Sequence, residues 1–185
     1  WELTLDISHW MVVHESTLTN RKSLIEPVLS RSHHIHARVG FEEGPQVNDP
    51  KAPEWKGVVD RHLDLWEAII RTNLENGKPV TITTEFGPPN YMPTEPYTQN
   101  PMSDQWETNT YMMKLIKDRI NHPNGSHKTS NPTAASKATL PQPTWSAAVN
   151  PSSRRQNASS TPTTAASATL GCATKALSIS AVPRL

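Results

Sequence analysis

Acidic residues are missing from the last third of this chain. All 17 Asp and Glu of the 185 residues lie in 1–122, and 123–185 contains none. Twelve Lys and Arg accompany those acids, which gives the first part a charge of −5, and six in the remainder give +6. The net charge of +1 therefore describes neither part, and it does not mark a basic protein that binds nucleic acid.

Cysteine and long apolar runs are also scarce. The single Cys172 excludes a disulfide framework and a cysteine metal cluster. No run of about 18 apolar residues occurs, which excludes a membrane-spanning helix and argues against a membrane partner. The chain begins at Trp1, with no initiator Met and no signal peptide, which predicts a start partway through a domain. A cytoplasmic protein is the expectation.

The residues 123–185 are mostly of four types, with 11 Ser, 9 Thr, 12 Ala and 7 Pro. Their apolar residues are scattered without a helical or strand period. Such a segment buries too little apolar surface to offset chain entropy, which predicts a disordered tail after a domain at 1–122. A mucin-like stalk, a basic binding tail and a chance extension all fit this composition, and we assign it no function.

Three segments of the first part alternate apolar and polar side chains with a period of two. This pattern predicts strands at 3–7, 33–39 and 79–86. Helical spacing predicts helices at 58–76 and 104–120, and a weaker one at about 20–31 that Pro27 shortens or kinks. Strands that alternate with helices indicate parallel βαβ units. A further short strand fits around 46–48, within the long connection 40–57.

Ionisable side chains lie on the polar faces of the three expected strands. Asp6 and Glu85 close two of them, His36 lies in the third, and His9 follows Asp6 into the next loop. Inward faces converge in a closed parallel barrel, where two carboxylates and one imidazole suit Mn²⁺, Mg²⁺, Co²⁺ or Zn²⁺. Taken alone, Asp6 fits the capping of a turn as well as it fits metal binding. A buried Glu85 is costly unless it is paired or bound to metal.

Three runs carry a more specific resemblance. They are LTLDISHWMVVHES (3–16), HIHARVGFEEGPQVNDPKAPEW (34–55) and VTITTEFGPPNY (80–91). Together they resemble the sugar phosphate isomerase/epimerase family of xylose isomerase-like TIM barrels. The resemblance covers about 1–120 and implies an α/β fold, a partial (β/α)8 TIM barrel made of about strands five to eight.

The resemblance also implies roles for individual residues. It assigns a divalent metal, Mn²⁺, Mg²⁺ or Co²⁺ ahead of Zn²⁺, to Asp6, His36 and Glu85. It makes Glu85 the acid/base and places His9 in contact with a small sugar substrate. Further candidates for polar substrate contacts are His34, Arg38 and Glu43, although an ordinary half-buried strand position also fits His34.

One family feature has no counterpart, because the Glu of strand four precedes the start of the chain. The expected function is a metal-dependent sugar or sugar phosphate isomerase/epimerase acting through an ene-diolate, impaired by truncation. A half-barrel leaves strand edges unpaired, which implies a missing N-terminal half-barrel or a second copy as partner. Two alternatives stay open: a non-catalytic remnant, and an AP endonuclease-like phosphodiesterase that would need Asp49 and His62 as extra ligands.

Overall fold

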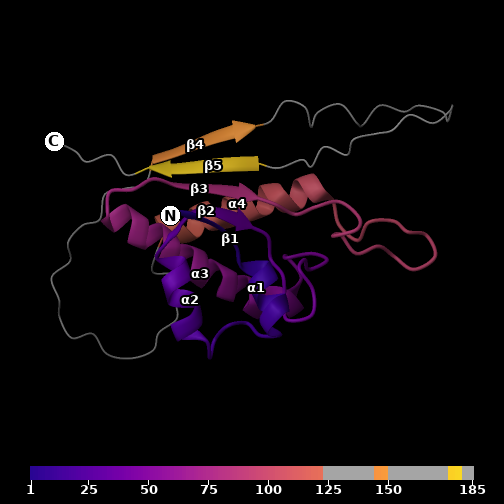
Figure 1. Ribbon diagram of the computed structural model, residues 1–185. Helices are drawn as coiled ribbons and strands as arrows, with labels where there is room; N and C mark the ends of the chain where they lie inside the picture. The colour runs from indigo at the N-terminus through magenta and orange to yellow at the C-terminus, as the bar shows by residue number, and fades with distance from the viewer. Residues whose placement is uncertain (123–143, 150–174, 181–185) are drawn as a thin grey trace.

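The computed structural model describes residues 1–122, 144–149 and 175–180, which form one sheet with helices packed against it (Figure 1). The strands are β1 (Leu3–Asp6), β2 (Ser32–Ala37), β3 (Val80–Thr84), β4 (Thr144–Val149) and β5 (Lys175–Ser180). The helices are α1 (Ile7–His14), α2 (Lys22–Leu29), α3 (Lys56–Glu75) and α4 (Gln105–Asn121), and the short 3-10 helix η1 (Pro53–Trp55) precedes α3.

The sheet combines parallel and antiparallel pairs in the order β1-β2-β3-β5-β4. β1, β2 and β3 are parallel, with Asp6 opposite His36 and His36 opposite Thr83. β5 runs antiparallel to β3, with Ile179 opposite Val80, and β4 runs antiparallel to β5. The register therefore brings the carboxyl ends of β1, β2 and β3 to the same edge of the sheet.

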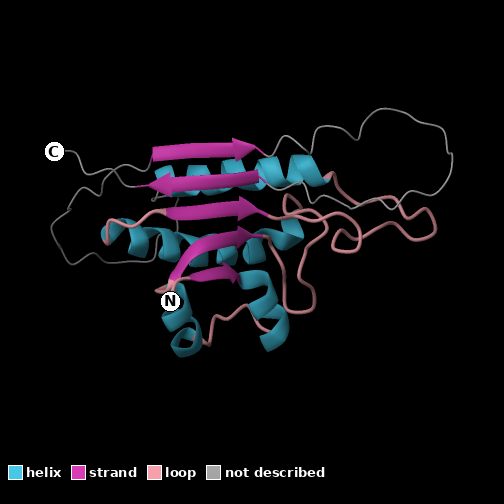
Figure 2. Ribbon diagram, turned by 45° about the horizontal axis from the view of Figure 1, so that its top comes forward, coloured by secondary structure: helices cyan, strands magenta, loops and turns pink. Residues whose placement is uncertain are grey.

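The helices of the described residues lie on one side of the sheet (Figure 2). On that side the strands bury Leu5, Ile35 and Ile82, which pack against α3 and α4 in the main core. The opposite side carries alternate residues such as Thr4 and Thr81, which are exposed. This alternation is the period-two pattern of the sequence, because successive side chains of a strand point to opposite faces.

Local signals explain where the helices begin. Asp6 caps α1 by accepting a hydrogen bond from Ser8 N at 2.9 Å. Asp104 caps α4 in the same way, accepting from Glu107 N at 2.7 Å. α2 contains Pro27 and spans only eight residues, as expected for a proline that removes one helical hydrogen bond. The predicted strands and the other helices agree with the structure to within a few residues.

The prediction of a partial TIM barrel is wrong. A (β/α)8 barrel continues its sheet with parallel strands until it closes. Here the strand beside β3 is β5, which runs antiparallel, and within the described residues only three strands of the sheet are parallel. β1 and β4 end the sheet, so it is open rather than curled toward closure. The architecture is an open mixed sheet covered by helices on one face.

Two connections also differ from expectation. The segment after β1 was expected to be a loop, but its first residues form α1, which buries Ile7 and Met11. No strand forms at 46–48. Instead, the chain turns tightly between Phe41 and Gly44 and returns, with Val47 N donating to Val39 O at 3.0 Å. The polar side chains near 46–48 bond to neighbouring loops rather than line a strand.

The predicted disordered tail contains two strands, so that prediction is wrong for β4 and β5. The pairing with β3 gives the reason: it supplies a ladder partner that the composition of the tail does not reveal. In the sequence, Leu177 and Ile179 alternate with Ser178 and Ser180, which is a short period-two signal. The rest of 123–185 lies outside the described residues.

Candidate metal centre

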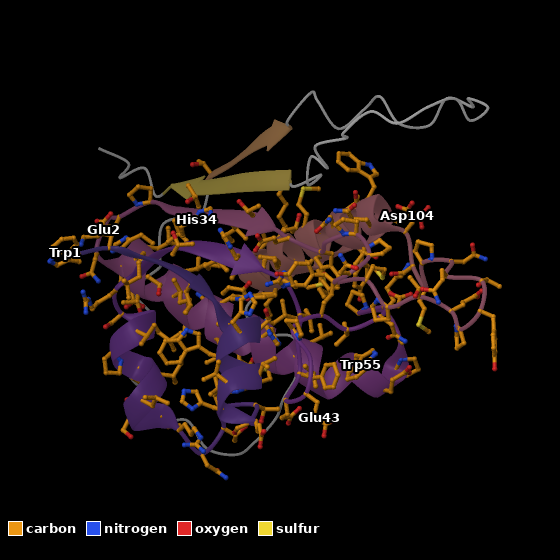
Figure 3. All side chains as sticks on the ribbon, turned by 45° about the vertical axis from the view of Figure 1, so that its right-hand side comes forward. Trp1, Glu2, His34, Glu43, Trp55 and Asp104 are labelled. Atoms are coloured by element: carbon orange, nitrogen blue, oxygen red, sulfur yellow. The ribbon has the colours of Figure 1, made fainter. Side chains whose placement is uncertain are left out.

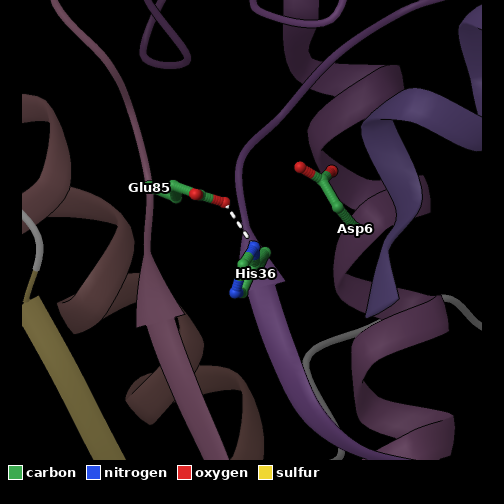
Figure 4. A group of neighbouring side chains, drawn as sticks. All are labelled: Asp6, His36 and Glu85. Atoms are coloured by element: carbon green, nitrogen blue, oxygen red, sulfur yellow. Dashed lines mark ion pairs between the residues drawn. The ribbon is translucent and has the colours of Figure 1, made fainter. Parts of the chain in front are cut away.

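Three ionisable side chains meet at the carboxyl ends of the parallel strands. Asp6 ends β1, His36 lies next to last in β2, and Glu85 directly follows β3. Asp6 and His36 are register partners, and Glu85 lies two residues beyond Thr83, the partner of His36. All three therefore share the face of the sheet that carries no helix among the described residues. Figure 4 shows His36 between the two carboxylates.

The distances between these side chains suit one shared metal ion. Asp6, His36 and Glu85 each offer one ligand atom, and these atoms lie within 4.8 Å of one another. Ligand atoms about 2.0–2.2 Å from an ion are separated by about 3–4 Å, so modest side-chain adjustment closes the set. Glu85 Oε2 is enclosed and makes no aligned hydrogen bond, although it lies 2.7 Å from His36 Nδ1. An enclosed carboxylate oxygen with a vacant lone pair fits a metal ligand.

His36 and Glu85 alter each other's pKa. The contact with Glu85 raises the pKa of His36 above 6.5, and partial burial opposes that effect. The His36 ring lowers the pKa of the Glu85 carboxyl below 4.5. Glu85 is therefore an ionised carboxylate at neutral pH. Because a histidine binds metal through an unprotonated nitrogen, a bound cation would take the place of a proton on the His36 ring and would pair with the Glu85 carboxylate.

Asp6 belongs to a second network, centred on Arg38. Arg38 Nη2 donates to Asp6 Oδ2 at 2.6 Å and to His9 Nε2 at 2.7 Å. Ser8 Oγ donates to Asp6 Oδ1 at 2.5 Å. A guanidinium has no lone pair to accept with, so His9 Nε2 is the acceptor and the His9 proton lies on Nδ1.

A pocket of about 370 Å³ opens over these side chains. It is lined by Asp6, His9, His36, Arg38 and Glu85, and by the loop 87–91 that follows β3. The Tyr91 ring lies over the guanidinium of Arg38, with its centroid 4.4 Å from Cζ, and covers one face of that group. The predicted site residues did not include Tyr91, which lies in the loop after β3.

Amide side chains form hydrogen bonds with the backbone just after Glu85. Gln46 accepts from Gly87 N at 2.8 Å and donates to Gly87 O at 3.2 Å. Asn109 accepts from Phe86 N and donates to Phe86 O, both at 2.9 Å. Gln105 also donates to Phe86 O at 2.9 Å. These residues position Glu85, and no local pattern in the sequence distinguishes them from other amides.

Two predicted substrate residues lie apart from the pocket. His34 points to the same face as His36 but bonds Thr81 Oγ1 at 2.5 Å. Burial, followed by the neighbouring His36, lowers the pKa of His34 below 6.5. Glu43 is exposed in the turn after Phe41, and Figure 3 shows it at the periphery, well separated from His34. Neither residue lines the pocket formed by the described part of the chain.

The extra ligands of a multi-metal cluster are not brought to the centre. His62 is fully buried in α3, where its ring bonds Val58 O at 3.0 Å. Burial lowers the pKa of His62 to about 4, so its ring is neutral. Asp49 accepts from Lys51 N at 3.0 Å within its own loop. Within 1–122, 144–149 and 175–180, only Asp6, His36 and Glu85 group as a metal-binding set.

Comparison with protein-family models, with curated proteins and with solved structures finds no match to this chain. The resemblance to the sugar phosphate isomerase/epimerase family therefore stays a prediction. No helix in the described part of the chain is long and apolar enough to cross a bilayer.

Proposed function

We propose that this protein is a divalent-metal-dependent sugar isomerase that moves a proton through an ene-diolate of its substrate. The observation that carries the proposal is the grouping of Asp6, His36 and Glu85 within 4.8 Å at one sheet edge, under an open pocket. The resemblance of the three runs to isomerases and epimerases of sugars points the same way. A cytoplasmic location remains part of the proposal.

The donor set favours Mn²⁺, Mg²⁺ or Co²⁺. Two carboxylates and one imidazole form a mainly oxygen-based set with three protein ligands, which leaves positions for substrate oxygens. A bound ion would polarise a carbonyl and the adjacent hydroxyl, which makes the carbon-bound proton between them more acidic. Asp6 stays anchored by Ser8 and Arg38, so its carboxylate needs little reorganisation to bind the ion.

Glu85 is the proton acceptor in this proposal. Its depressed pKa keeps it ionised at neutral pH, and the amides around Phe86 and Gly87 fix its backbone. His9 also lines the pocket, with its Nε2 occupied by Arg38 and its Nδ1–H left to donate to a substrate hydroxyl. This pairing orients the substrate relative to Glu85.

The choice between isomerisation and epimerisation follows from the number of carboxylates. Epimerisation removes a proton from one face and returns one to the other, which calls for two acid/base groups. Among the described residues the pocket holds two carboxylates, and Asp6 is tied to Ser8 and Arg38. Glu85 alone can remove and return a proton on a single face. A one-face aldose–ketose isomerisation is therefore favoured over an epimerisation.

Metal binding is tested by titrating Mn²⁺ into the full chain by calorimetry. We expect His36→Ala and Glu85→Ala each to weaken Mn²⁺ binding at least about tenfold, the effect of losing one ligand. His34→Ala is the matched control, since it removes a histidine two residues away on the same strand and face. Equal Mn²⁺ binding by wild type, His36→Ala and Glu85→Ala would contradict the metal site.

Catalysis is tested separately by deuterium exchange. Aldoses and ketoses are incubated in D₂O with the Mn²⁺-loaded chain, and incorporation at the carbon beside the carbonyl is followed by NMR. We expect exchange in wild type and its loss in Glu85→Gln. Tight Mn²⁺ binding without exchange would instead indicate a non-catalytic metal-binding protein.

A further inference from the structure

Arg38 is a buried cation at the wall of the pocket. It is 3% exposed, and it is the only Lys or Arg among the residues that line the pocket. Tyr91 covers one face of its guanidinium. Burying a guanidinium is costly unless its N–H groups find acceptors, so the partners of each nitrogen decide what this residue does.

Two of its three nitrogens are occupied. Nε donates to Ser8 Oγ at 3.3 Å, and Nη2 donates to Asp6 and His9. Within the described part of the chain, no residue accepts from Nη1. Nη1 is also not among the enclosed side-chain atoms that lack a partner, so it reaches the surface. Because Arg38 is nearly buried and lines the pocket, the surface that Nη1 reaches is the pocket itself.

The charges of the pocket point the same way. Asp6 and Glu85, the two carboxylates among the lining residues, balance a divalent ion. As a metal ligand, His36 binds through an unprotonated ring nitrogen. The loaded pocket therefore keeps the single positive charge of Arg38 in a largely desolvated position. One singly negative ligand group would neutralise it.

We propose that the substrate of this pocket is a sugar acid, whose carboxylate accepts a hydrogen bond from Arg38 Nη1. A carboxylate carries the single charge that the loaded pocket lacks, whereas a phosphate monoester carries about −1.5 to −2 at neutral pH. The carboxylate contacts only Nη1, because Nε and Nη2 of the guanidinium already donate to other side chains. The inference rests on the proposed metal site and names the substrate class for it.

Three-carbon probes test the charge without assuming a particular sugar. Glycerate, glycerol 3-phosphate and glycerol are titrated by calorimetry into the Mn²⁺-loaded full chain. We expect glycerate to bind at least about tenfold more tightly than glycerol, the effect of one charge-assisted hydrogen bond, with glycerol 3-phosphate between them. Equal affinity for glycerate and glycerol would overturn the inference. If glycerol 3-phosphate bound most tightly, the preferred ligand group would be a phosphate rather than a carboxylate, and the inference would be overturned.

The variant Arg38→Gln tests whether Arg38 causes the preference for glycerate over glycerol. Glycerate chelates metal by itself, so the preference must depend on Arg38 to support the inference. We expect Arg38→Gln to lose the advantage of glycerate over glycerol when both are titrated at a Mn²⁺ concentration that saturates the metal site of the variant. Circular dichroism shows whether the variant is folded. Arg119→Gln is the control, since Arg119 pairs with Glu67 and Asp64 away from the pocket.

If Arg38→Gln does not fold, a second variant tests whether the preference depends on Arg38. Arg38→Lys, which keeps the charge but shortens the reach, then serves as the second variant, and it should lose most of the glycerate advantage. An undiminished advantage in either folded variant would overturn the inference. Absence of Mn²⁺ binding in wild type would overturn the proposed metal site, whereas Mn²⁺ binding without a preference for glycerate would overturn only the sugar acid.

Discussion

The side-chain amide of Asn109 brackets the backbone of Phe86, accepting from its N–H and donating to its carbonyl oxygen, both at 2.9 Å. Asn109 is fully buried in α4, and Phe86 is fully buried just after β3. The pair fixes where the chain leaves the sheet, one residue after Glu85. Helix α4 thereby sets the position of the carboxylate at the centre.

Asn109→Ala should destabilise the protein and weaken metal binding together. It leaves the buried Phe86 N–H without an acceptor, which costs about 1–3 kcal/mol of unfolding free energy. Urea unfolding measures the stability and Mn²⁺ titration measures the site. Asn76→Ala removes an exposed asparagine at the end of α3 and should change stability by less than about 0.5 kcal/mol. Unchanged Mn²⁺ affinity in folded Asn109→Ala would contradict the positioning role.

Gln46→Glu should be more destabilising than Gln46→Ala. The amide donates to Gly87 O, and the carboxylate would place an acceptor opposite that oxygen in a buried position. Burying an unpaired charge costs more than losing the two hydrogen bonds. Thermal melting at neutral pH compares the two variants. The opposite order of melting temperatures would show that the loop around Gly87 rearranges to accept a carboxylate.

Gly40→Ala should destabilise the loop beneath Asp6. A Cβ at Gly40 would lie 2.7 Å from Ser8 Cβ and 2.8 Å from the carbonyl oxygen of Pro45, so the backbone must move. We expect a loss of about 1–3 kcal/mol, as for overpacking of a core. Gly57→Ala is the contrasting variant, because nothing lies within 4 Å of its Cβ position and the residue is in α3. That variant should gain about 0.5 kcal/mol. Equal effects in urea unfolding would contradict the packing argument.

His62 should make the protein sensitive to acid. Its pKa falls from 6.5 to about 4 on burial, so between these values the unfolded chain binds a proton that the folded chain does not. Its contribution to stability is complete above pH 6.5 and is lost as the pH falls toward 4. The pKa difference corresponds to about 3 kcal/mol of unfolding free energy.

Urea unfolding between pH 7 and pH 4 measures this dependence. We expect His62→Gln to lose stability less steeply with falling pH than wild type, whatever its stability at pH 7. His122→Gln removes an exposed histidine at the end of α4 and should keep the wild-type slope. A slope in His62→Gln as steep as that of wild type would show that other groups cause the acid sensitivity.

The sequence by itself determined β1, β2 and β3, the helices α3 and α4, and the shared face of Asp6, His36 and Glu85. The reason is local: a period of two fixes which side chains lie on one face of a strand, and parallel strands align their carboxyl ends. The cap of α4 at Asp104 is likewise local, since a carboxylate beside free N–H groups acts over two or three residues. The absence of acids after Asp118 marks a change of composition along the chain.

Only the tertiary structure decided how the sheet ends and what surrounds the centre. The antiparallel pairing of β5 with β3 joins residues about 95 positions apart, and it overturned the expected barrel. The burial of Arg38 beneath Tyr91 and the amide contacts of Asn109 likewise depend on partners from distant elements. A pattern of residue types specifies faces and periods, whereas the pairing of distant edges and buried polar groups is set by the whole packed chain.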